Sequence, residues 1–206
     1  FKEYGFSYSR KQIAECYMVM GGIPYYMSMM DRSKSLAQNI DSLFFSSNAE
    51  LKDEFSDLYQ ALFKNAGSHI KVITALSTKG MGLTRKEILA STGLTDNGAF
   101  STVLEELENC GFIRKYSPFG SNISLNRKRL DSSSLYQLID FYTLFYFRFI
   151  ERNNYQDEHF WTTSAWASLS ASSMSPSTSP RAASREWWRW YTTCRTPSPS
   201  ASVRAH

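Results

Sequence analysis

The chain has 206 residues, of which 42% are hydrophobic, 15% aromatic and 20% charged, and its formal net charge is +4. This length is enough for one ordinary domain or two small ones. The charge is unevenly placed, because residues 1–161 hold 18 basic and 18 acidic residues whereas residues 162–206 hold five Arg and one Glu. The part of the chain that can fold is therefore neutral, which excludes a strongly basic protein that coats nucleic acid.

Cysteine and histidine are too scattered to predict a metal site or a disulfide framework. The three cysteines are far apart with no C-x-x-C pair, and the three histidines lie in unrelated surroundings. The most apolar stretch, Phe141 to Phe147, is far below the ~20 residues that span a bilayer. We therefore expect a cytoplasmic protein with no metal site and no membrane partner.

Helical periodicity dominates residues 1–66. Ser9 and Gln12 match a capping box, which predicts a helix that ends at Gly21-Gly22. One face of that helix carries Ile13, Tyr17 and Met20. A short helix is expected from Ser35 to Phe45. The next helix has apolar residues at i, i+3, i+4, i+7 and i+8, which predicts a stripe that faces the core. The residues of this stripe are Phe55, Leu58, Tyr59, Leu62 and Phe63.

Residues 67–138 predict three helices followed by two strands. The first helix runs from Ser68 to Ser77, and Thr84 to Glu87 is a second capping box that opens the next one, which ends at Gly93. The third helix follows a cap at Asn97, is closed by Cys110-Gly111, and has four apolar positions: Phe100, Val103, Leu104 and Leu107. The strands are expected at residues 112–116 and 134–138. This order indicates a winged helix-turn-helix with a two-stranded wing, followed by an aromatic helix from Ile139 to Arg152.

The third helix is poorly suited to reading DNA. It contains no Lys or Arg and carries Glu105, Glu106 and Glu108, whose charges repel phosphate. Basic residues lie on the wing loop instead, at Arg127, Lys128 and Arg129, which makes these three the candidate DNA contacts. A winged domain that only packs within a larger protein explains the pattern equally well.

No catalytic constellation is present in the sequence. It contains no G-x-x-x-x-G-K-[ST] phosphate-binding loop, no G-x-S-x-G and no H-E-x-x-H motif. We expect no catalytic residues in this chain.

A series of blocks in residues 8–161 points to one family. The first block runs from Tyr8 to Tyr26 and contains Gly21-Gly22-Ile23-Pro24. Later blocks include Ser35 to Ile40, Gly82 to Ile88, Gly111 to Tyr116 and Leu135 to Asp140. In this order they resemble the lid and winged helix of prokaryotic AAA+/STAND-type ATPases, specifically the archaeal-type ATPase family common in Bacteroidetes.

The resemblance implies an incomplete ATPase. In that family a P-loop domain comes first, followed by the helical lid, the winged helix and a nuclease-like domain. Gly21, Gly22 and Pro24 match the family's G-x-P element, which lies beside the adenine. In the family, ATP with Mg would be held mainly by the P-loop domain, and the 206 residues of this chain do not contain that domain. We therefore expect no tight nucleotide binding and no ATP hydrolysis by this chain alone.

The last segment departs from the family. Residues 162–206 are rich in Ser, Ala, Arg, Pro and Trp and contain no Ile or Phe. Such a composition cannot bury enough apolar area to offset chain entropy, so we expect disorder. When one set of codons that encodes Glu186 to Tyr191 is read one base out of frame, it encodes an apolar run. This suggests that residues 162–206 are an out-of-frame translation.

The sequence thus predicts a mostly α-helical protein. We assign residues 1–66 to an AAA+ lid, 67–138 to a winged helix-turn-helix, 139–161 to an aromatic helix that starts a truncated domain, and 162–206 to the tail. The alternative functions are a free-standing winged-helix DNA-binding regulator and a protein-interaction module built on the aromatic helix. A homo-oligomer is left open.

Overall fold

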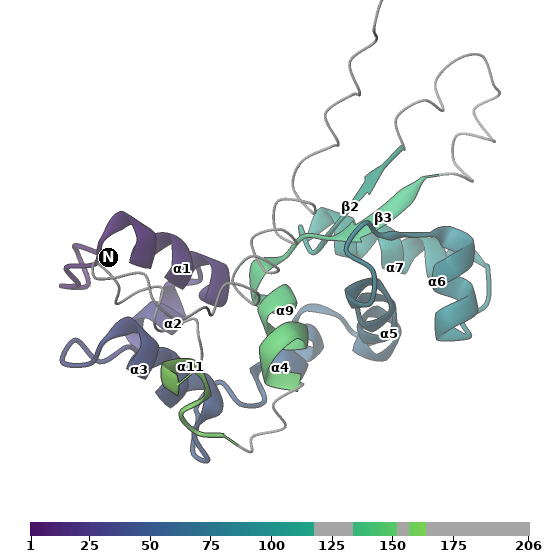
Figure 1. The fold of residues 1–206 in the computed structure, drawn as a ribbon. Coiled ribbons are helices and arrows are strands. Elements are labelled where there is room, and N and C mark those ends of the chain that lie inside the picture. Colours follow the sequence, from purple (N-terminus) through teal and green to yellow (C-terminus); the bar gives the residue numbers. More distant parts are fainter. Residues whose placement is uncertain (118–133, 152–156, 164–206) are drawn as a thin grey trace, which may run out of the picture.

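The computed structural model describes residues 1–117, 134–151 and 157–163. These residues form a mostly helical structure with a small three-stranded antiparallel sheet, which confirms the predicted helical class. Two groups of elements lie at opposite ends of the molecule, and helices α4 and α9 lie between them (Figure 1). The described residues include no helix long and apolar enough to cross a membrane.

The N-terminal group is built from short helices. Its elements are α1 (Arg10–Met20), α2 (Pro24–Ser28), α3 (Leu36–Ile40) and the π-helix η1 (Asp41–Phe45), and α4 (Glu54–Leu62) leads from it to the second group. The capping box predicted for α1 is confirmed, because Ser9 Oγ accepts from Gln12 N–H and Gln12 Oε1 accepts from Ser9 N–H, at 3.3 and 2.9 Å. The predicted helix over residues 35–45 is also present, although its second half has π geometry.

Two predicted apolar faces are corrected. Of the predicted face of α1, Met20 is buried but Tyr17 is 50% exposed, because the helix also turns Cys16, Met18 and Val19 into the core. Leu62 on α4 is also 50% exposed, whereas Phe55, Tyr59 and Phe63 of the same stripe are buried. Leu62 is the last residue of its helix, so the chain leaves the helical path there and turns Phe63 into the core.

The second group contains α5 (Ala66–Ser77), β1 (Leu83–Thr84), α6 (Arg85–Thr92), α7 (Gly98–Asn109), β2 (Ile113–Tyr116) and β3 (Leu135–Leu138). The Thr84–Glu87 capping box and the end of α6 at Gly93 are confirmed. β2 and β3 pair as antiparallel strands, with Ile113 opposite Leu138. Strand β1 was not predicted, and it adds the third strand by pairing with the other side of β3.

The aromatic helix begins later than predicted. It consists of α9 (Phe141–Phe145) and the π-helix η2 (Tyr146–Ile150). Residues Ile139 and Asp140 are not helical, because both of their N–H groups donate to the carbonyl oxygen of Phe112, at 2.9 and 3.2 Å. The helix can therefore begin only after the chain has left the sheet, and Asp140 caps its first turn.

A short helix, α11 (Phe160–Thr163), brings the chain back to the N-terminal group. The buried carboxylate of Asp41 accepts from the N–H groups of Trp161 and Thr162, at 2.7 and 2.9 Å, and from the hydroxyl of Thr162. The tail was predicted to begin at residue 162, but α11 continues through Thr163, whose N–H donates to the carbonyl oxygen of His159 at 2.9 Å. Residues 164–206 of the predicted tail lie outside the described residues.

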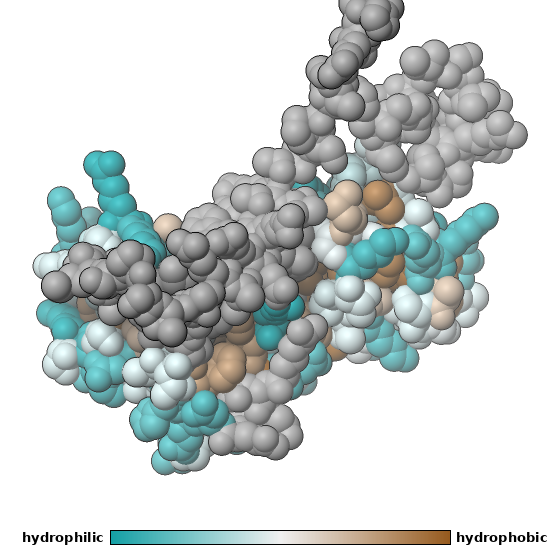
Figure 2. Space-filling view, in the orientation of Figure 1, coloured by the Kyte–Doolittle hydropathy of each residue, from teal (hydrophilic) through white to brown (hydrophobic). Residues whose placement is uncertain are grey.

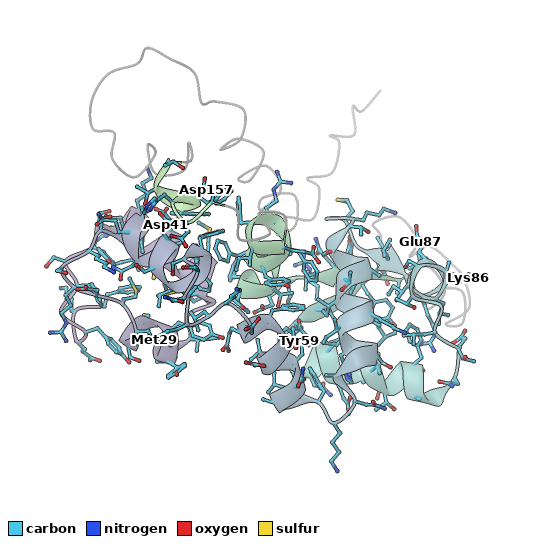
Figure 3. All side chains as sticks on the ribbon, turned by 90° about the horizontal axis from the view of Figure 1, so that it is seen from below. Met29, Asp41, Tyr59, Lys86, Glu87 and Asp157 are labelled. Atoms are coloured by element: carbon cyan, nitrogen blue, oxygen red, sulfur yellow. The ribbon has the colours of Figure 1, made fainter. Side chains whose placement is uncertain are left out.

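One hydrophobic core connects both groups. A single cluster of buried side chains runs from Phe6 in the first group to Leu138 and Trp161. Tyr59 lies near the middle of the molecule, whereas Lys86 and Glu87 lie at its far end on α6 (Figure 3). In the view of Figure 2, hydrophilic residues gather towards both ends and hydrophobic residues show between them. The domain boundaries at residues 66 and 138 stay predictions.

Candidate functional site

The three residues predicted to lie beside a nucleotide form the tight turn between α1 and α2. Gly21 and Gly22 both have left-handed backbone conformations, with φ of 63° and 76°. Pro24 is the first residue of α2, a position where its missing N–H costs nothing. The turn therefore has no Cβ atom at two consecutive positions.

Helix α9 and helix α4 hold this turn in place. A Cβ placed on Gly21 would lie 3.5 Å from Cβ of Tyr142, so the turn packs directly against α9. On the other side, the hydroxyl of Tyr26 donates to Oε1 of Glu54 at 2.6 Å, which ties α2 to the start of α4. The turn is thus fixed by tertiary contacts as well as by its own backbone.

An exposed aromatic ring covers part of the turn. A Cβ on Gly22 would lie 2.4 Å from Cε2 of Tyr17, so the ring occupies the space that a side chain would need. The ring of Tyr17 also meets Phe141 edge-on, with centroids 5.3 Å apart. Tyr17 is 50% exposed and Tyr25 is 62% exposed, which is high for aromatic side chains. The sequence placed Tyr17 on one helix face with Ile13 and Met20 and did not predict this arrangement.

A half-buried carboxyl group lies behind the turn, at the start of α9. Oδ2 of Asp140 accepts from Thr143 N–H at 2.8 Å, and burial raises the pKa of the Asp140 carboxyl. Burial and the neighbouring Glu54 carboxylate also raise the pKa of Tyr26. The interior behind the turn therefore disfavours added negative charge.

Replacement of Asp140 by Asn should test this cost. Because the pKa of the Asp140 carboxyl is raised in the folded state, the protonated form of this group stabilises the fold. This contribution is complete below the pKa of the unfolded chain and is lost as the pH rises through the pKa of the folded state. Asn keeps a side-chain oxygen for the cap without the charge. We expect Asp140→Asn to gain stability relative to the original chain between pH 4 and pH 8, measured by urea denaturation.

The control for this measurement is Asp57→Asn, which removes a charge from an exposed position on α4. Its stability relative to the original chain should change little over the same range. If Asp140→Asn loses stability as the pH rises, the carboxylate is stabilising in its charged form and the inferred cost of burial is wrong.

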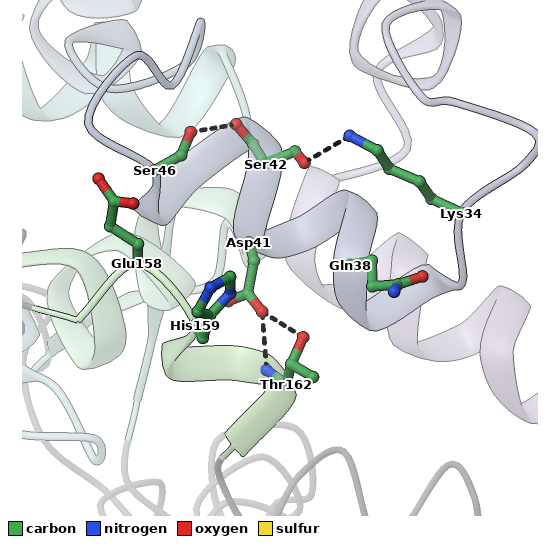
Figure 4. A pocket seen from close by; sticks show the side chains of 8 residues that line it. All are labelled: Lys34, Gln38, Asp41, Ser42, Ser46, Glu158, His159 and Thr162. Carbon is green, nitrogen blue, oxygen red and sulfur yellow. Dashed lines mark hydrogen bonds between the residues drawn. The ribbon is translucent and has the colours of Figure 1, made fainter.

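A second polar site lies around Asp41, where a pocket of about 260 Å³ opens between α3, η1 and α11 (Figure 4). Nζ of Lys34 donates to Oγ of Ser42 at 2.9 Å on one wall. Both oxygens of Asp41 are engaged by Trp161 and Thr162, so this carboxylate acts as a clamp for α11. No signal in the sequence marked Asp41, because its partners lie about 120 residues away.

No group of His, Cys, Asp and Glu side chains within the described residues is arranged to hold a metal ion. His69 and Glu106 form a pair, with Nε2 and Oε2 atoms 2.8 Å apart. The ring of His69 stacks on Phe63 with centroids 4.0 Å apart. This pair joins α5 to α7 and serves the packing of the second group.

The surface of α7 is acidic, as the sequence indicated. Glu108 accepts from the backbone N–H of Lys115 at 3.2 Å, and Glu105 lines a neighbouring hollow. The guanidinium of Arg85 donates to Oδ1 of Asp96 at 2.6 and 2.9 Å, so its charge is already paired. This surface therefore offers little to phosphate groups. The predicted DNA contacts Arg127, Lys128 and Arg129 lie outside the described residues, and their role stays a prediction.

Searches of known protein families, curated proteins and solved structures find no match for this chain. The resemblance to AAA+/STAND-type ATPases therefore remains a prediction that rests on the sequence blocks described above.

Proposed function

We propose that residues 1–66 are the adenine-side lid of an ATP-binding protein of the AAA+/STAND type. The observation that carries this proposal is the Gly21–Pro24 turn. Its two positions without Cβ atoms allow the ring of Tyr17 to lie directly on the turn, and this half-exposed aromatic ring suits the close approach of a flat base. The blocks of sequence that resemble the family support the same assignment.

The second part of the proposal concerns residues 67–138, which we assign to a winged helix-turn-helix. Three helices followed by an antiparallel strand pair, with β1 on the outer side of β3, support this assignment. Its acidic third helix favours packing within a larger protein over reading DNA. The shared hydrophobic core supports a fixed attachment to the lid.

The residues present suit only the base of ATP. Gly21, Gly22 and Tyr17 offer a surface for adenine, but these 206 residues contain no phosphate-binding loop. The triphosphate and its Mg would be held by another domain, in the same protein or in a partner. When bound there, Mg would neutralise phosphate charge, and no residue of this chain is assigned to it.

If this chain binds only the base and another domain binds the triphosphate, a measurable prediction follows. Adenosine and ATP should bind with similar dissociation constants of about 1 mM or weaker, because the base supplies the whole interaction. Saturation-transfer NMR measures both affinities, and phosphate release measures hydrolysis, which we expect to be absent. Inorganic tripolyphosphate is the control and should not bind.

Two results would overturn the proposal. The first is the absence of any adenosine signal at millimolar concentration with the folded chain. The second is ATP turnover by the purified chain that is lost when Pro24 is replaced by Ala, because it would require a complete active site within these residues.

A further inference from the structure

We propose that the exposed part of the Tyr17 ring is the surface on which the base stacks, so that Tyr17 determines the affinity for a purine. This inference rests on the proposed function, since it identifies the residue that recognises the base at the same turn. It goes beyond the glycine and proline positions, because it assigns the main attraction to a side chain on α1.

The ring of Tyr17 is held in place before any ligand arrives. One side lies over Gly22, whose hypothetical Cβ would be 2.4 Å from Cε2 and 2.9 Å from Cδ2 of the ring. The ring also meets Phe141 at 5.3 Å between centroids, with the planes inclined at 66°. These two contacts position the ring at the turn, which reduces the side-chain entropy that stacking would cost.

Exposure gives this ring a free surface. Tyr17 is 50% exposed although the rest of its helix turn is buried, with Cys16 at 1%, Met18 at 8% and Val19 at 1%. An aromatic ring that remains open to water at a glycine turn is suited to a flat aromatic ligand, because every base has a π-face. Replacement of Tyr17 by Ala should weaken adenosine binding roughly tenfold.

Gly22 gains a second role from this geometry. Any side chain at position 22 would strike the Tyr17 ring and would also have to adopt a φ of 76°. The ring would then be displaced from its place beside the turn. Gly22→Ala should therefore weaken adenosine binding in the same direction as Tyr17→Ala, although position 17 is unchanged.

The experiment compares four single variants by titration with adenosine, observed by NMR. Tyr17→Ala and Gly22→Ala should lose affinity, and Tyr17→Phe should keep it within about twofold because the ring remains. Tyr25→Ala is the matched control, since Tyr25 is 62% exposed and its ring contacts Tyr26 at 6.2 Å. It should also stay within about twofold. Circular dichroism verifies that each variant is folded.

A spectroscopic signature separates stacking from an indirect effect. The ring current of Tyr17 should shift the adenine protons of bound adenosine upfield, and this shift should disappear in Tyr17→Ala and persist in Tyr17→Phe. If Tyr17→Ala binds adenosine as well as the original chain does, or if only Tyr25→Ala loses affinity, the inference is wrong while the proposed function stands. If the original chain binds no adenosine, both are wrong.

Discussion

Replacement of Tyr59 by Ala should destabilise the whole molecule by about 4 kcal/mol, because a large buried aromatic side chain is lost from the centre of the core. Tyr59 is fully buried on α4. Its ring lies 4.8 Å from Phe112 of the second group and 4.9 Å from Phe55 of its own helix, measured between centroids. Urea denaturation followed by far-UV circular dichroism measures the loss.

The control is Tyr59→Phe, which keeps the ring and removes only the hydroxyl. This hydroxyl lies 3.2 Å from Oγ1 of Thr143, so the expected loss is about 1 kcal/mol. Both variants should unfold in one transition, because the two groups share one core. Two separate transitions in the original chain would show that the groups fold independently, and a loss below 1 kcal/mol for Tyr59→Ala would show that this ring contributes little to the core.

Local signals predicted most of the helices correctly. Ser9 with Gln12 and Thr84 with Glu87 form the capping boxes that the sequence indicated. Helix α7 begins after Asn97, which accepts from Phe100 N–H. These features depend on residues three or four apart, so the sequence carries the full information for them.

Features that depend on distant residues were not predictable in the same way. Strand β1 is two residues long and exists only because Leu83 lies opposite Tyr136. The clamp between Asp41 and Thr162 joins positions about 120 residues apart. Sequence patterns relate residues that are close along the chain, so neither of these contacts could be predicted from such patterns.

The candidate site was predictable only in part. Gly21 and Pro24 stand out in the sequence because they end one helix and begin another. The position of the Tyr17 ring could not be predicted, because it depends on Phe141, which α9 brings to the end of α1. One signal was available: Tyr17 lies four residues before Gly21, so the two positions lie on the same face of the helix.

Gly82→Ala is the second substitution with a large expected effect, a loss of about 3 kcal/mol or more. Gly82 has a φ of 85°. A Cβ there would lie 2.4 Å from the carbonyl oxygen of Tyr136 and 3.2 Å from Cα of Gln137. Both are backbone atoms of β3, so neither can turn away as a flexible side chain would. The strand pairing of Leu83 with Tyr136 would have to separate.

Gly93→Ala provides a matched control for this substitution. Gly93 also has a positive φ, 68°, but a Cβ there would meet nothing within 4 Å. Its loss should be only about 1 kcal/mol, the cost of the left-handed conformation alone. The difference between the two variants in urea denaturation therefore measures the steric conflict with β3. In Gly82→Ala, hydrogen exchange should accelerate most at the amides that join β1 to β3. Equal losses for the two variants would mean that backbone conformation alone matters, and that β1 does not need its close approach to β3.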